Sequence, residues 1–297
     1  MSKYLDPKAD LTFKKVFGKN KRLVMSLLNA LLPLPKDMKI TEVEYLTSEN
    51  IPENPAKKYS IVDVRCTDNF NRHFIVEMQS YWTQEFFTRT VFNATAAYSN
   101  QLAKGKAFEM LKDVYALSLV NEEAFCYKQD DGYIQEFYLT NSKHTEDIRK
   151  YLSLIFIELP KFKPSNRGDE KMKNLWLKFL TQINEETTDV ETDLLANEEI
   201  SEALEIVKTS AYTDTELAAY RKYWLDISTE KSAIQGAEKR AEEKGRQEGR
   251  EEGRLEGRQE GRQEKTLEIA RNLKHLGISI VDIVKATQLS EAEINEL

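Results

Sequence analysis

Two runs of β-forming residues joined by a short polar segment constrain the fold of this chain more than any other feature. Residues 60–66, SIVDVRC, and residues 73–79, HFIVEMQ, are rich in β-branched side chains and alternate in polarity. Residues 67–72, between them, contain the Asp and Asn that favour turns. The pattern predicts a β-hairpin whose strands are covered on both faces of a sheet.

Each strand of this hairpin carries an acidic residue within an apolar run. Asp63 follows Ile61 and Val62, and Glu77 follows residues 74–76. The turn brings the two carboxylates to similar heights, and Gln79 points the same way as Glu77 because strand side chains alternate faces. Buried carboxylates need a partner, and Mg²⁺ is a natural one because it prefers carboxylate and water oxygens. A solvent-facing position in the strand is the alternative interpretation.

The motif Asp63-x13-Glu77-x-Gln79, on a hairpin behind an N-terminal helix, resembles the core of the PD-(D/E)XK nuclease fold. In particular it resembles the Rpn group of recombination-promoting nucleases, also described as PD-(D/E)XK nuclease family putative transposases. In that group Gln stands where other members have the motif Lys. Further matching stretches are residues 10–18, DLTFKKVFG, then Phe87 and Arg89, then Gly105-Lys106 with Leu111, Val114 and Tyr115. The resemblance covers roughly residues 5–125.

The resemblance implies an α/β fold with a restriction-endonuclease-like core and the activity of a metal-dependent DNA endonuclease. Asp63 and Glu77 would hold Mg²⁺, or another divalent cation, which activates water and stabilises the charge on the scissile phosphate. Gln79 would be the third catalytic residue. Because an amide cannot act as a general base, Gln79 would orient the attacking water or a phosphate oxygen. The link to recombination and transposition implies DNA as the substrate.

Four other polar residues are candidates for substrate binding. Asp10 is a helix N-cap by pattern alone, and the resemblance places it near the acidic cluster. Lys14 belongs to a basic segment that is either a solvated helix face or a phosphate-contacting edge. Arg89 and Gln101 interrupt the apolar face of the helix predicted after the hairpin. Arg89 would neutralise a phosphate or pair with Glu77, and an ordinary surface arginine is an equal alternative.

The chain divides into four predicted parts. Residues 1–165 form the nuclease core and residues 166–230 a helical subdomain that closes it. Residues 231–264 are a Gly/Glu/Arg repeat, either helix or linker, and residues 265–297 a helix-turn-helix-like module. Within the core, helical spacing from about 12 to 31 is interrupted near Gly18, and strands are expected at 39–46, 113–120, 134–139 and 151–159.

The repeat has Gly at every fourth position from 245 to 261, each followed by Arg. Five glycines cost a helix about 1 kcal/mol each relative to Ala, and like charges four residues apart repel. The acidic and basic stripes nevertheless lie on nearly opposite sides of a helix, which predicts a homo-oligomer; a flexible linker is the alternative.

In the C-terminal tail, Ser279 and Ser290 each begin a helix-capping signature. The last helix has no Lys or Arg, which favours a packing or regulatory module over a DNA reader.

Composition excludes several other classes of protein. A net charge of -7 argues against a protein that coats nucleic acid over its whole surface, although a local basic cleft is compatible with it. Two cysteines indicate a reducing compartment. We expect a cytoplasmic location without a membrane segment, because no apolar run approaches 18 residues.

The alternative to a metal-dependent DNA endonuclease is a second hypothesis: a catalytically inactive DNA-binding or self-assembly protein built on a nuclease-like core.

Overall fold

The computed structural model describes residues 3–35, 37–47, 49–50, 60–102, 105–125, 127, 132–164 and 170–297. The chain forms two compact units, Met1–Ser228 and Thr229–Leu297. Among the described residues, no helix is both long enough and apolar enough to cross a membrane.

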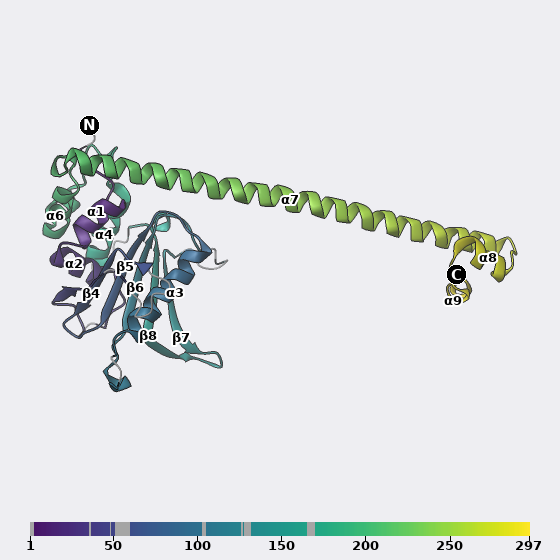
Figure 1. Cartoon of the computed structure of the whole chain (residues 1–297), viewed down its shortest axis with the longest axis horizontal. Coiled ribbons are helices and arrows are strands. Elements are labelled where there is room, and N and C mark those ends of the chain that lie inside the picture. Colours follow the sequence, from purple (N-terminus) through teal and green to yellow (C-terminus); the bar gives the residue numbers. More distant parts are fainter. Residues whose placement is uncertain are drawn as a thin grey trace. The chain divides into compact units, whose positions relative to one another are not determined.

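A mixed sheet of six strands lies at the centre of the first unit, in the order β1-β4-β5-β6-β8-β7 (Figure 1). Neighbours β5, β6 and β8 are parallel, and the β4–β5 and β7–β8 pairs are antiparallel. Every residue of β6 is buried, as expected for a parallel strand covered on both faces. The strands are β1 Val43–Tyr45, β4 Val64–Asp68, β5 His73–Gln79, β6 Val114–Val120, β7 Ile134–Asn141 and β8 His144–Glu158, and a separate pair contains β2 Glu49–Asn50 and β3 Ser60–Ile61.

Strands β4 and β5 form the predicted hairpin, with Val64 opposite Val76. The turn is closed by Asp68, which accepts hydrogen bonds from the Arg72 backbone N–H and from the Arg72 guanidinium. Asn71 has the left-handed φ of 58° that the sequence allows for Asn at such a turn. The first strand is shorter than predicted, so Asp63 lies in a bend immediately before β4.

Helices cover both faces of the sheet. One face shares a large hydrophobic core with the N-terminal helices and with the helices that follow the sheet; in this core Trp176 packs against Phe17 at a ring-centroid distance of 5.3 Å. Helix α3 covers the other face, where Phe86 lies in one apolar cluster with Ile75 and Phe156. The helices of this unit are α1 Asp10–Phe17, α2 Lys21–Leu31, α3 Gln84–Ser99, α4 Lys171–Gln182, α5 Thr192–Ala196 and α6 Glu198–Ile206, with 3₁₀ turns at Phe108–Met110, Leu159–Lys161 and Thr209–Ala211.

The α/β architecture predicted from the sequence is confirmed, as is the break between helices near Gly18. The N-cap predicted at Asp10 is wrong. Ala9 occupies the N-cap, and Asp10 is the first residue of α1. Its carboxylate pairs with Lys14, one turn further along the helix, instead of capping a backbone N–H.

Helix α7, Asp214–His275, contains the entire Gly/Glu/Arg repeat, so the repeat is helical rather than a linker. The first turns of α7 belong to the first unit, where Tyr220 packs with Leu5 and Ala9. In the second unit, α8 Ile280–Thr287 and α9 Glu291–Glu296 begin at the predicted caps Ser279 and Ser290. Their apolar sides enclose a small core with Ala270, Ile283 and Ile294 fully buried.

Candidate active site at the end of strand β5

The hairpin brings Asp63 and Glu77 together, as predicted. Val64 is paired with Val76, so Asp63, one residue earlier, faces Glu77, one residue later. The Asp63 Oδ2 atom accepts a hydrogen bond of 2.8 Å from the backbone N–H of Met78. Glu77 is only 5% exposed, and its Oε1 accepts a 2.9 Å hydrogen bond from Asn93 Nδ2. Its second carboxylate oxygen, Oε2, is buried and has no hydrogen-bond partner among the residues that the structure describes.

Burial dominates the electrostatics of this pair. Burial, helped by the Asp63 charge, raises the pKa of Glu77 to about 7, against the opposing effects of Arg89 and the Asn93 hydrogen bond. Burial also raises the pKa of Asp63, against the Met78 N–H and Lys14, which favour the ionised form. The two carboxylates therefore lack sufficient positive charge around them, and a bound cation would supply it.

Three of the candidate substrate-binding residues lie beside this pair. Lys14 Nζ is 2.5 Å from Asp10 Oδ1 and 3.7 Å from Asp63 Oδ1. Arg89 Nη2 donates a 3.1 Å hydrogen bond to Gln79 Oε1. Helix α1 thus contributes one cation to the cluster and helix α3 the other.

Gln101 is not brought to this cluster. Its side-chain Nε2 donates a 2.9 Å hydrogen bond to the backbone C=O of Lys112, and its Oε1 accepts a 2.8 Å hydrogen bond from the backbone N–H of the same residue. Lys112 precedes β6, and the first residue of β6, Val114, pairs with His73 at the start of β5. Gln101 therefore stabilises the loop at the opposite end of the sheet from Glu77.

The structure adds residues that the sequence reasoning missed. Asn93 is completely buried in α3, and a polar residue inside an apolar helix face was the signal that could have identified it. Tyr223, in α7, shares a 2.9 Å hydrogen bond with Ser80, the residue after Gln79. Burial raises the pKa of Tyr223, and the nearby charges of Asp10 and Asp63 raise it further. No local pattern could connect Tyr223 with a strand 143 residues away.

A divalent cation fits the carboxylate pair. The described part of the chain contains no cluster of three His, Cys, Asp or Glu side chains arranged for a metal. Mg²⁺ commonly uses only one or two protein carboxylates and retains several waters. Asp63 and Glu77 meet that requirement, and the unpartnered Oε2 of Glu77 offers a ligand atom.

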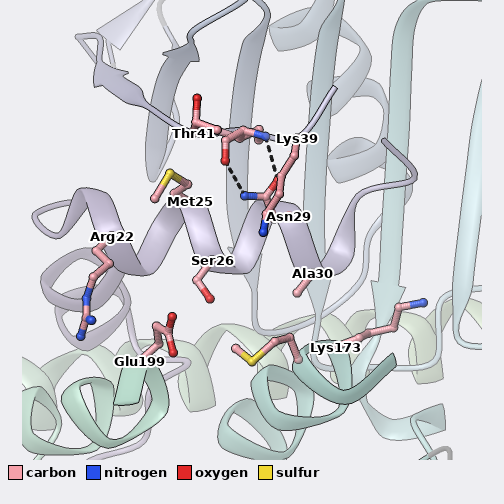
Figure 2. Close-up of a pocket in the computed structure, with 11 residues that line it drawn as sticks. Arg22, Met25, Ser26, Asn29, Ala30, Lys39, Thr41, Lys173 and Glu199 are labelled. Atoms are coloured by element: carbon pink, nitrogen blue, oxygen red, sulfur yellow. Dashed lines mark hydrogen bonds between the residues drawn. The ribbon is translucent and has the colours of Figure 1, made fainter. Parts of the chain in front are cut away.

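A pocket elsewhere in the unit lies between α2, the segment around Lys39 and α4 (Figure 2). Asn29 in its wall forms two hydrogen bonds with the Ile40 backbone, of 2.8 and 2.9 Å. Arg22 at its edge is paired with Glu198 and Glu202. None of its lining residues belongs to the carboxylate cluster, so this pocket is separate from the candidate active site.

Comparison with known proteins agrees with the geometry. Neither the curated proteins nor the solved structures gave a match. The family described as PD-(D/E)XK nuclease family transposase matches residues 7–237, which includes the acidic hairpin, both cation-bearing helices and the first turns of α7. With most of its length matched, this chain belongs to the PD-(D/E)XK nuclease family of transposases.

Proposed function

We propose that this protein is a metal-dependent endonuclease that hydrolyses phosphodiester bonds in DNA, with Mg²⁺ or another divalent cation held by Asp63 and Glu77. The observation that carries the proposal is the Glu77 Oε2 atom, which is buried near Asp63 and receives no hydrogen bond from the described part of the chain. A buried carboxylate oxygen in this state is costly unless it is protonated or bound to a cation. Membership of a nuclease family supports the cation.

When bound, the cation supplies an activated water and neutralises charge on the scissile phosphate. The residues of the chain orient the reacting groups. The backbone N–H of Met78 holds the Asp63 carboxylate by a hydrogen bond, and the Asn93 side chain holds the Glu77 carboxylate in the same way. The Gln79 amide is itself held, because its Nε2 donates a 2.8 Å hydrogen bond to the Tyr81 C=O. We therefore assign Gln79 the task of aiming the Arg89 guanidinium, which is suited to phosphate oxygens.

The same site supports DNA as the partner. The chain has a net charge of -7, so attraction to DNA must come from local cations, and Lys14 and Arg89 lie beside the carboxylates.

We also propose that chains self-associate along the charged repeat of α7, and that the protein works in the cytoplasm. The latter rests on the cysteine usage; Cys66 is free and buried, and Cys126 lies outside the described residues.

Plasmid cleavage with and without Mg²⁺ tests the proposed function. Wild type should nick or linearise DNA only with the cation. Asp63→Asn and Glu77→Gln should each lower the rate at least about 100-fold, because the cation supplies several kcal/mol of transition-state stabilisation. Asp147→Asn is the control, since Asp147 is an exposed carboxylate that forms an ion pair with Arg149 in the β7–β8 hairpin.

Equal cleavage by all four proteins would place the chemistry outside the hairpin. An inactive wild type that still binds DNA in a mobility-shift assay would instead support the second hypothesis, a DNA-binding or assembly protein.

A further inference from the structure

Asn93 is an unusual residue for its position in α3. It is 0% exposed, and its neighbours on the buried face of the helix include Phe86, Ala94 and Ala97. Asn is a poor helix former and costs free energy when buried without partners. Its Nδ2 donates to Glu77 Oε1 at 2.9 Å, which links the middle of α3 directly to the carboxylate pair.

The hydrogen bond between Asn93 and Glu77 leaves two acceptors without donors. In the described part of the chain, neither Oδ1 of Asn93 nor Oε2 of Glu77 has a hydrogen-bond partner, and both atoms are buried. An amide oxygen and an ionised carboxylate oxygen can only accept hydrogen bonds, so they cannot satisfy one another. Two such acceptors on adjoining side chains require a hydrogen-bond donor or a cation.

A purely structural tether between α3 and the sheet does not explain the second acceptor. Thr90 in the same helix is equally buried, and its hydroxyl donates a 3.0 Å hydrogen bond to the Phe86 C=O. The hydroxyl of Thr90 is thus satisfied within the helix. Asn93 directs its donor toward Glu77 and leaves its oxygen for a further group.

We propose that Asn93 is a positioning residue of the divalent-cation site. Its amide N–H holds Oε1 of Glu77, which leaves Oε2 for the cation, and its Oδ1 accepts a hydrogen bond from water bound to that cation. This inference rests on the proposed function, because it requires the cation at Asp63 and Glu77. It adds a residue from α3 to a site that the motif confines to the hairpin.

Cation affinity measured without DNA tests this role. Isothermal titration of the full chain with Mn²⁺ at pH 8 compares wild type with Asn93→Leu, which keeps the branched shape of the side chain and removes both polar groups. Outer-shell partners of metal ligands typically contribute 10–100-fold to metal affinity, so we expect a weakening of about that size. Thr90→Val is the matched control, and its affinity should equal that of wild type. Asn93→Ser, smaller and polar, tests the same point should the leucine variant fail to fold.

The outcomes separate this inference from the proposed function. Cation binding by wild type that is lost in Glu77→Gln but unchanged in the Asn93 variants would overturn the role of Asn93 and leave the cation site intact. Absence of Mn²⁺ binding by wild type would overturn both. Equal weakening by Thr90→Val would show that any disturbance of α3 lowers affinity, and would also overturn the specific role of Asn93.

Discussion

At the residue scale, the burial of Glu77 makes the stability of the folded protein depend on pH. Its pKa is about 7 in the folded protein, against an ordinary value of 4.5, because the carboxyl group is removed from water. Between these values the folded state binds more protons than the unfolded state, so stability decreases as pH rises. The contribution of the protonated carboxyl is complete below about 4.5 and is lost as pH passes through about 7.

We therefore expect Glu77→Gln to stabilise the cation-free protein at pH 8 and to have little effect at pH 4.5. The neutral amide removes the cost of an ionised buried carboxylate. A gain of at least about 3 °C in Tm is expected at pH 8. Thermal unfolding followed by circular dichroism in EDTA at both pH values measures it. A Tm difference that is the same at both pH values would contradict the pKa assignment.

A second residue-scale prediction concerns the hairpin turn. Arg72 is 3% exposed, and its guanidinium pairs with Asp68 and donates a 2.7 Å hydrogen bond to the Met38 C=O. Arg72→Met leaves Asp68 buried without its counterion, so we expect the free energy of unfolding to fall by about 3–5 kcal/mol. Urea unfolding measures the change. The control is Arg149→Met, in an exposed ion pair with Asp147, which should leave the free energy of unfolding nearly unchanged because water screens such a pair.

At the scale of elements, the helices after the sheet belong to the same hydrophobic core as the sheet. Trp176 of α4 is fully buried, contacts Phe17 and Phe179, and donates a hydrogen bond to Ser26. The predicted boundary at 165/166 itself lies outside the described residues, and the parts of the chain on either side of it share one hydrophobic core.

Trp176→Ala should consequently destabilise the whole first unit by about 3–5 kcal/mol, the usual cost of removing a large buried aromatic side chain. Urea unfolding followed by tryptophan fluorescence and by circular dichroism should give one coincident transition for this unit, shifted to lower urea. Two separated transitions, of which only one shifts, would instead show that residues 166–230 unfold as an independent subdomain.

At the scale of the whole molecule, the proposed self-association places a second copy of the chain against the repeat of α7. The positions of its five glycines meet no atom within 4 Å, so a neighbouring helix could approach closely there. Its glutamates and arginines are exposed and lie on opposite sides of the helix. Within one helix, the glutamates repel one another and so do the arginines. Pairing the glutamates of one copy with the arginines of another would offset this repulsion.

Charge reversal tests this association. Sedimentation of the full chain should show oligomers that weaken as salt rises. Replacing Arg250, Arg254 and Arg258 by Glu makes one variant, and replacing Glu252, Glu256 and Glu260 by Arg makes another. Each variant alone should be monomeric, and the mixture should associate. A wild type that is monomeric at all concentrations would refute the proposed homo-oligomer.

The sequence alone was sufficient where the physics is local. The alternation of side chains along strands predicted the hairpin and the proximity of Asp63 to Glu77. Capping chemistry predicted the helix starts at Ser279 and Ser290. Each of these depends on residues of one helix cap or one short hairpin, whose geometry the backbone limits to few choices.

Only the tertiary structure could decide which distant side chains meet. It assigned Asn93 to Glu77 and Tyr223 to Ser80, and it placed Gln101 at the other end of the sheet. These contacts arise from the packing of helices α3 and α7 on the sheet, and packing satisfies buried polar groups across separations that no local pattern encodes.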